Sequence, residues 1–364
     1  MPLSSQQTIL MFDFTHLLFD KLVIHRVGNK ANDEGYFASK AEHNLMDDQL
    51  QVVLFDYFFS SFKGEDQYKF SHSADLRMND MYTYCQNIFN NADSFLQMSE
   101  HILTHLYNKS DHPKIKSGEL YVCLFRDVLI DDELVDAIGI FKSEQKSTFI
   151  QVNEASQSLR IGYFEGIDTK KLDKGVLIFN TLEEEGYMVK TIDALNRSDD
   201  EAKFWKSDFL GIKPIENSVY TTKAYLNLAR DFVEETLVAQ PEVGKKEGLE
   251  VMTKAVEYFE QNEDFRLDNF AETVFDEPEV QTKFKEYKQK QQDENELALE
   301  DTFEISEPAV KKEKKRIRHL ITLDDSVQIK LNPNHQERNN QVIERGFDSQ
   351  RGQYYYKIFY EYES

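Results

Sequence analysis

The feature that most constrains the fold is a succession of short strand patterns between residues 118 and 193. Each pattern is rich in β-branched and aromatic residues and is bounded by glycine, asparagine or aspartate, which favour turns. The patterns are GELYVCLFRDVLI, DELVDAIGIFKSE, STFIQVN, SLRIGYFEG, KGVLIFNT and GYMVKTID. No dozen-residue helix separates them, and neighbouring parallel strands would need such a crossover. The sequence therefore predicts an antiparallel sheet in which these strands follow one another as a meander.

Helical patterns flank the predicted sheet. Before it, apolar residues recur at helical spacing over residues 48–62, 80–88 and 93–107. After residue 199, helical patterns follow one another, the first ending at Gly211, a residue type favoured just past a helix. The next helix is expected to start on Thr221 or Thr222. This order predicts an α+β fold with a mixed N-terminal domain, a helical region and a short C-terminal β unit.

The pattern divides the chain into four predicted segments. These are an α+β N-terminal domain over residues 1–198, a helical region over 199–291, an acidic linker over 292–308, and a basic helix plus C-terminal strands over 309–364. The linker is inferred because residues 292–307 hold seven acidic side chains and no basic ones, a composition typical of a solvated segment.

The charge of the chain limits its partners. It carries 66 acidic and 43 basic side chains, for a formal net charge of −23, so the molecule repels nucleic acid at long range. Any DNA contact must therefore come from a local positive patch. The two cysteines are too few for a disulfide framework and fit a reducing cytoplasm. Asp13 and Asp20 interrupt the apolar run near the N-terminus, which argues against a signal peptide or a membrane span.

The densest positive patch is AVKKEKKRIRHL at residues 309–320. Six basic side chains fall within eight residues with only Glu313 against them, so six minus one gives +5. As a helix, this segment would place Ile317, Leu320 and Ile321 on a partly apolar side and its cations outward. Six cations could replace counterions at DNA phosphates and give salt-sensitive, sequence-independent binding. The alternative is that they neutralise the acidic segment just upstream, in the same or a neighbouring subunit. The candidate DNA-binding residues are Lys311, Lys312, Lys314, Lys315, Arg316 and Arg318, with Lys21, Arg26, Lys30 and Lys142 as additional basic contacts.

Three other motifs have both a functional and a structural interpretation. His101 and His105 have metal-compatible helical spacing, but Ile102 stands where a zinc-protease helix needs its glutamate. Residues 267–287 pair two helical patterns, as in a helix-turn-helix or a simple helical hairpin. The tail QYYYKIFYEY suits either base stacking or a strand packed on both faces. No phosphate loop or nucleophile elbow is present, and we predict no enzymatic activity, no metal and no cofactor.

Four stretches carry a family resemblance: FDKLVIHRVGNK at residues 19–30, HLYNKSDHPKIKSGELYV at 105–122, AIGIFKSEQK at 137–146 and FWKSDFLG at 204–211. Together they resemble the NdpA-type nucleoid-associated protein family of bacteria. The resemblance extends over nearly the whole chain. None of these strings is a catalytic signature, and the resemblance assigns no base-reading residue.

The resemblance implies location at the bacterial nucleoid, binding of double-stranded DNA and contact with type II topoisomerase subunits. It brings no enzymatic activity and no cofactor. The leading hypothesis is a cytoplasmic, non-enzymatic, nucleoid-associated DNA-binding protein that forms a homodimer. A second hypothesis is an acidic adaptor that binds topoisomerase or another nucleoid protein rather than DNA. A third is a metal-dependent enzyme whose acidic clusters hold magnesium.

Overall fold

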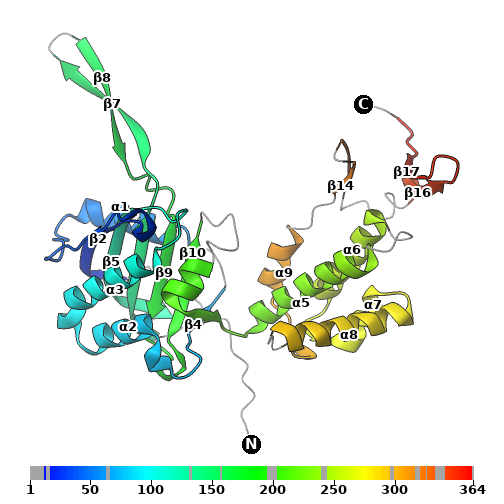
Figure 1. Ribbon diagram of the computed structural model, residues 1–364, viewed down its shortest axis with the longest axis horizontal. Coiled ribbons are helices and arrows are strands. Elements are labelled where there is room, and N and C mark those ends of the chain that lie inside the picture. The colour runs from blue at the N-terminus through cyan, green and yellow to red at the C-terminus, as the bar shows by residue number, and fades with distance from the viewer. Residues whose placement is uncertain are drawn as a thin grey trace, which may run out of the picture. The chain divides into compact units, whose positions relative to one another are not determined.

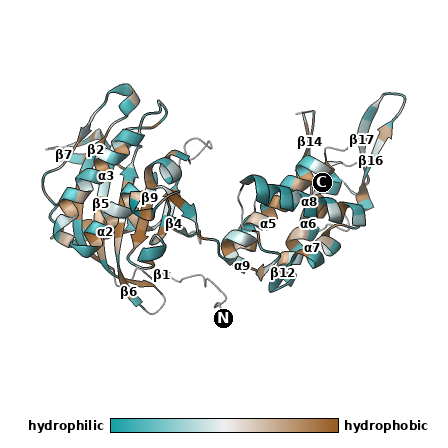
Figure 2. Ribbon diagram, turned by 60° about the horizontal axis from the view of Figure 1, so that its bottom comes forward, coloured by the Kyte–Doolittle hydropathy of each residue, from teal (hydrophilic) through white to brown (hydrophobic). Residues whose placement is uncertain are grey.

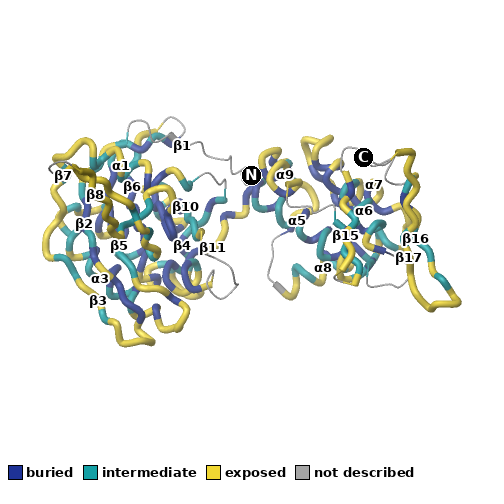
Figure 3. Tube along the Cα trace, turned by 90° about the horizontal axis from the view of Figure 1, so that it is seen from above, coloured by how far each residue is buried: buried dark blue, intermediate teal, exposed yellow. Residues whose placement is uncertain are grey.

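A computed structural model of the chain describes residues 12–13, 17–62, 66–130, 133–155, 158–194, 203–238, 244–295, 299–315, 320–324, 326–332 and 341–362. The chain forms two compact units that divide between Ile215 and Glu216. We call them the sheet unit and the helical unit (Figure 1). Each unit contains buried segments of its own (Figure 3). The division differs from the one expected after residue 198, because β11 (Ile212–Pro214) pairs with β4 (Tyr68–Phe70) in the sheet.

Among the described residues, nine strands form one sheet in the order β11-β4-β10-β9-β6-β5-β2-β3, with β1 beside one end of β5. Every pairing in it is antiparallel, which confirms the predicted α+β class. The remaining strands of this sheet are β1 (Phe12–Asp13), β2 (Leu18–Val27), β3 (Tyr36–Phe37), β5 (Gly118–Ile130), β6 (Glu133–Ser143), β9 (Lys174–Phe179) and β10 (Met188–Asp193).

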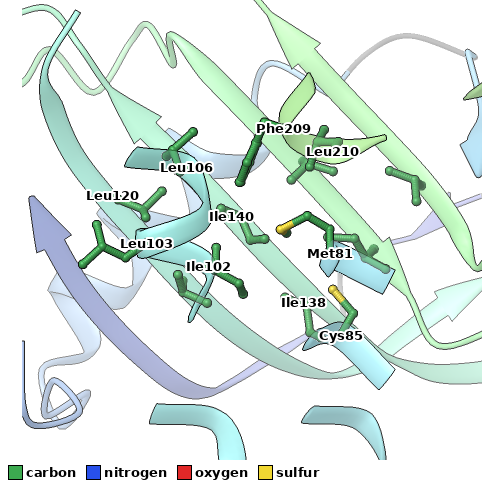
Figure 4. Packing of buried hydrophobic residues seen from close by; sticks show 14 of the residues in the cluster. Met81, Cys85, Ile102, Leu103, Leu106, Leu120, Ile138, Ile140, Phe209 and Leu210 are labelled. Carbon is green, nitrogen blue, oxygen red and sulfur yellow. The ribbon is translucent and has the colours of Figure 1, made fainter. Parts of the chain in front are cut away.

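Helices cover both faces of the sheet, because successive side chains of a strand point to opposite sides. The helices are α1 (Asp48–Phe59), α2 (Asp80–Asn90), α3 (Phe95–Lys109) and the π-helix η5 (Phe204–Leu210). Leu120, Val122 and Leu124 of β5 join the core beneath α2, α3 and η5. Figure 4 shows Leu120 there beside Leu103 and Leu106 of α3. The alternate residues Tyr121, Cys123 and Phe125 join the core beneath α1. The central strands are accordingly rich in apolar residues (Figure 2).

Two of the predicted meander strands leave the sheet. β7 (Ser147–Ala155) and β8 (Ser158–Gly166) pair only with each other and form a two-stranded ribbon that projects from the sheet unit (Figure 1). The sheet closes behind them, because β6 pairs directly with β9 from Ala137 to Lys142. We call this hairpin the ribbon.

The helical unit has an aromatic core built around Phe232, Phe265, Phe270 and Phe284. Asn217, rather than a threonine, caps its first helix, since the Asn217 side chain accepts from the Tyr220 backbone N–H. No helix in the described part of the chain is long and apolar enough to span a membrane. Its helices are α5 (Ser218–Phe232), the π-helix η6 (Val233–Leu237), α6 (Lys245–Gln261), α7 (Leu267–Val274), α8 (Pro278–Asn295) and α9 (Glu307–Lys314). Its strands pair as β12 (Asp264–Arg266) with β13 (Thr302–Glu304), β14 (Leu320–Leu323) with β15 (Val327–Lys330), and β16 (Ile343–Asp348) with β17 (Gln353–Ile358).

The segment expected to be an acidic linker is instead part of the helical unit. α8 continues to Asn295, and Leu299 is buried in the core of the unit. The Glu300 carbonyl accepts a hydrogen bond from the Tyr225 hydroxyl at 3.0 Å. β13 pairs with β12, so these backbone groups are satisfied inside the unit. In the described residues of this segment, the acidic side chains stand on a packed scaffold and not on a free connector.

Candidate nucleic-acid interface

Helix α9 presents the predicted basic residues. Ser306 caps it by accepting a hydrogen bond from the Ala309 backbone N–H, and a proline lies in its first turn, as is common at helix starts. Ala309 and Val310 are buried, and Val310 packs in the core of the helical unit. Because Glu313 follows Val310 by three residues, it shares the buried side. The lysines of the helix therefore face outward.

The burial of Glu313 determines the charge of the outer side. This carboxylate is the only acidic group within the basic run, and its residue is only 5 % exposed. The exposed residues of this stretch are Lys311, Lys312, Lys314 and Lys315. Among residues 311–315 the solvent side of α9 is thus exclusively cationic.

Lys311 and Lys314 form surface ion pairs. Lys311 lies 2.5 Å from Glu307 one turn earlier, and Lys314 lies 2.8 Å from Glu260 of α6. The sequence left open the alternative that the basic run neutralises the acidic segment just upstream. The Lys311–Glu307 pair is a contact of that kind. Exposed pairs of this kind are worth only about 0.2–1 kcal/mol. A phosphate can therefore compete for both lysines at little cost.

The helix is shorter than the sequence suggested. α9 ends at Lys314, and Arg316, Ile317 and Arg318 lie outside the described residues. Leu320 and Ile321 belong to strand β14 and not to an apolar helix face. Ile321 packs in a small core that joins the C-terminal strands. The described interface accordingly consists of four of the six predicted cations.

A second basic group lies on the C-terminal hairpin of β16 and β17. The Arg345 guanidinium lies 4.2 Å from the centre of the Tyr354 ring, and the Lys357 ammonium lies 5.0 Å from that of Phe359. Tyr354 is half exposed. The sequence drew attention to the aromatic tail but missed Arg345 and Lys357, for which interleaving with aromatic residues was the available signal. β17 ends at Ile358, so the predicted strand face does not extend to the last tyrosines.

A cavity of about 530 Å³ lies beside α9 within the helical unit. Side chains from α5, η6, α6, α9 and β14 line it, including Arg230, Lys245, Glu313 and Leu320. Its lining is mainly apolar, with charged groups among it. Sequence reasoning did not find this cavity, because two segments far apart in the sequence, residues 226–256 and 313–320, build it together.

The additional basic candidates belong to the sheet unit and differ in accessibility. Lys142 is fully buried and donates to the Lys116 carbonyl and, at 2.7 Å, to the Glu144 carboxylate. Burial lowers the pKa of Lys142, while the charge of Glu144 opposes this shift. A DNA phosphate cannot reach this ammonium, so Lys142 is removed from the predicted contacts. Arg26 and Lys30 are exposed, and Lys21 is half-buried in an ion pair with Glu42 at 3.0 Å.

The polar residues of the suspected helix-turn-helix are engaged in packing the α7–α8 hairpin. Gln281 donates to the Phe275 carbonyl at 2.8 Å, Lys283 pairs with Glu279 on its own helix, and Lys285 pairs with Asp268. These contacts fit the structural interpretation of a helical hairpin.

The suspected metal histidines have other neighbours in the structure. His105 lies 3.0 Å from the Phe209 carbonyl oxygen and near Asp80, while the His101 ring lies beside that of Tyr84 at a tilt of 37°. Burial lowers the pKa of His105. The described residues hold no group of three His, Cys, Asp or Glu side chains arranged for a metal ion.

Comparison with known protein families gives a match over most of the chain. Residues 23–350 match the sequence profile of a protein family described as nucleoid-associated protein YejK. The match extends over most of both units. No individual curated protein matches the chain.

Proposed function

Because the chain belongs to the family of nucleoid-associated protein YejK, we propose that it is a non-enzymatic protein that binds double-stranded DNA at the nucleoid without reading base sequence. The contact runs through the phosphate backbone and uses the outer side of α9. Arg316 and Arg318 extend the same basic segment in the sequence. The family membership supports the nucleoid role, and the chemistry of α9 supports the mode of contact.

The burial of Glu313 is the observation that carries this proposal. With that carboxylate turned inward, four exposed lysines occupy five consecutive positions. Lysine ammonium groups are strongly hydrated point charges on flexible stems and bind phosphates without a fixed geometry. They release counterions on contact and do not distinguish one sequence from another.

The net charge of the chain sets the strength of the interaction. The basic run contributes +5, so the remainder carries −23 minus 5, or −28. This remainder repels the duplex at distances within the Debye length, about 10 Å at 0.1 M salt. Binding is therefore weak and sensitive to salt. Two copies in a homodimer would present two α9 surfaces, which strengthens attachment when one duplex reaches both.

Charge substitution on α9 tests the proposal. A variant with Lys311→Gln, Lys314→Gln and Lys315→Gln should bind two unrelated duplexes on the order of tenfold or more weakly, and by the same factor for both. The matched control carries Lys254→Gln, Lys283→Gln and Lys290→Gln, which remove three ion-paired surface lysines elsewhere in the helical unit. It changes the net charge equally and should bind much more like the parent. Fluorescence anisotropy with labelled duplexes measures both.

Two results would contradict the proposal in different ways. Equal losses in both variants would mean that only net charge matters and that α9 is not the contact. If the parent protein fails to bind DNA yet co-purifies with a type II topoisomerase subunit, the chain acts as an acidic adaptor.

A further inference from the structure

The C-terminal hairpin of β16 and β17 ends in a polar turn, residues 349–353, which we call the tip. All five of its residues are exposed. Asp348 closes the turn, because its carboxylate accepts the backbone N–H groups of Gln350 at 2.9 Å and Arg351 at 3.1 Å. The Asp348 carbonyl accepts the N–H of Gly352 at 2.8 Å, and Gly352 has φ of 65°, a conformation that favours glycine. The tip therefore has a defined backbone shape.

Aromatic side chains support the two strands behind the tip. Tyr355 lies opposite Gly346, and its ring covers the glycine, since a Cβ on Gly346 would lie 2.4 Å from the Tyr355 Cζ. On the other face, the Arg345 guanidinium lies 4.2 Å from the centre of the Tyr354 ring, and the Phe347 ring lies 4.9 Å from it. The hairpin itself thus covers part of both tyrosine rings, which favours a structural role for them over an open platform for unpaired bases.

The base of the hairpin is attached to the helical unit. Ile343 is only 5 % exposed and packs in a small core with Ile321 and Leu331. Lys246 of α6 donates a hydrogen bond to the Ile343 carbonyl at 2.7 Å. With a buried base and supported strands, the hairpin holds its tip at the surface of the unit in a fixed position (Figure 3).

The charges of the hairpin leave a cation at the tip. Three cations and two carboxylates give residues 343–358 a net charge of +1, from Arg345, Arg351, Lys357, Glu344 and Asp348. Glu344 lies directly opposite Lys357, and the Asp348 carboxylate accepts the N–H groups of the turn. Arg351 is the only charged residue of the tip. Its pair with Asp348 at 3.8 Å is exposed and weak, so a ligand can replace it.

The chemistry of the tip fits duplex DNA better than a protein or a membrane. Ser349, Gln350, Arg351 and Gln353 offer hydrogen-bond donors and no apolar side chain, whereas protein hot spots and membrane surfaces bury apolar groups. The minor groove of A·T pairs displays only acceptors, at adenine N3 and thymine O2. Where that groove is narrow, its negative potential attracts arginine. A G·C pair adds the guanine N2 amino donor, which opposes a tip rich in donors.

We propose that the tip of the C-terminal hairpin enters the minor groove of duplex DNA, with Arg351 as the side chain that contacts the base edges. This inference rests on the proposed function and adds a second contact to the phosphate contacts of α9. The added contact responds to A·T content and not to the order of the bases, because A·T and T·A pairs look alike from the minor groove.

Duplexes that differ in the minor groove test the proposal. In an I·C duplex, inosine replaces guanine and lacks its N2 amino group, while the major-groove acceptors O6 and N7 are unchanged. The parent should bind an A·T-rich duplex and the I·C duplex about tenfold more tightly than the corresponding G·C duplex. The Arg351→Gln variant should bind all three within about a factor of two. Fluorescence anisotropy of the full-length protein at one salt concentration measures the dissociation constants.

Arg266→Gln is the matched control, because Arg266 is exposed in the same unit and its loss changes the net charge equally. This control should keep the preference of the parent. The proposal is overturned if the parent binds the I·C duplex as weakly as the G·C duplex, or if Arg351→Gln keeps the preference. It is also overturned if Arg351→Gln weakens binding to single-stranded DNA alone, which would assign the hairpin to unpaired bases.

The α9 variant separates this contact from the one in the proposed function. Lys311→Gln, Lys314→Gln and Lys315→Gln should weaken binding to all three duplexes by the same factor and leave their order unchanged. If that variant binds like the parent while the preference stands, the α9 contact fails and the groove contact holds. A parent that binds none of the duplexes overturns both.

Discussion

His25 lies buried on β2 between two hydrogen-bonding groups. The Ser39 backbone N–H donates to its Nδ1 at 3.1 Å, so its Nε2 carries the proton and lies 3.1 Å from the Ser99 hydroxyl. Burial lowers the pKa of His25 from 6.5 to about 4, with the charge of Glu100 opposing the shift. Below pH 6.5 the unfolded chain thus binds more protons than the folded one. The neutral imidazole stabilises the fold at neutral pH and loses this contribution as the pH falls toward 4.

A His25→Asn variant should therefore show a weaker pH dependence than the parent. Between pH 7 and pH 4.5, the free energy of unfolding of the parent should fall by about 2 kcal/mol more than that of the variant. Urea unfolding at the two pH values measures the difference, in which the carboxylates common to both proteins cancel. An equal fall in both would show that His25 is not held neutral by its site.

Lys142 and Glu144 form a buried ion pair at 2.7 Å, with side chains 0 % and 4 % exposed. Lys142→Ala leaves the Glu144 carboxylate buried without its cation, at a cost of about 3–5 kcal/mol in the free energy of unfolding. Removing both charges with Lys142→Met and Glu144→Leu should recover most of that loss, because two uncompensated desolvations disappear. Denaturant unfolding of the single and double variants tests this. A double variant as unstable as the single one would mean that the pair itself is indispensable.

At the scale of elements, Gly211 terminates η5 in a conformation that favours glycine, with φ of 61°. A Cβ there would lie 2.5 Å from the Asn79 side-chain nitrogen. That amide donates to the Gly211 carbonyl at 2.9 Å, and the oxygen of the same side chain caps α2 at the Tyr82 N–H. The turn after η5 and the start of α2 therefore share one side chain.

Gly211→Ala should cost about 2 kcal/mol in the free energy of unfolding, from backbone strain and from displacement of Asn79. Gly35→Ala is the control, since Gly35 has φ of 67° and a Cβ added there would meet nothing within 4 Å. It should show the strain alone, at about 1 kcal/mol. Equal effects in the two variants would contradict the role of Asn79.

Local patterns predicted most elements of this fold, since alternation or helical spacing is a property of neighbouring residues. Gly211 was identified as a helix end for that reason. The cap of α5 was missed because Asn217 and two nearby threonines are all competent caps. Only the packed structure selects among them, by burying Thr221 and Thr222. The departure of the ribbon from the sheet follows from the long-range pairing of β6 with β9, which no local pattern encodes.

The candidate site was predictable only in part. A run of basic residues is visible in any sequence, and its four described lysines are exposed as expected. Burial of Glu313 and of Lys142 was not predictable, because each depends on contacts with elements distant in the chain. Charge alone assigned both residues to the surface. Packing buries both residues instead. The burial of Glu313 leaves the outer side of α9 cationic over residues 311–315, whereas the burial of Lys142 removes it from the candidate DNA contacts.

At the scale of the whole molecule, a basic helix has to act against a net charge of −23. Salt acts differently on the long-range repulsion between the acidic protein and DNA and on the direct contacts between lysines and phosphates. Repulsion between distant charges is screened with a Debye length of about 10 Å at 0.1 M salt, whereas direct phosphate contacts release counterions. Each lysine that contacts a phosphate contributes about −0.9 to the slope of log K against log salt concentration. The slope therefore reports the number of lysine–phosphate contacts, whereas the affinity at a single salt concentration does not.

The most direct test of the α9 contact is this slope for the parent and for the Lys311→Gln, Lys314→Gln and Lys315→Gln variant. Loss of three phosphate contacts should make the slope shallower by about 2.7. The Lys254→Gln, Lys283→Gln and Lys290→Gln control should retain the parent slope. A variant that binds more weakly but with the parent slope, or as tightly as the parent, would contradict the account of α9 as the DNA-binding surface.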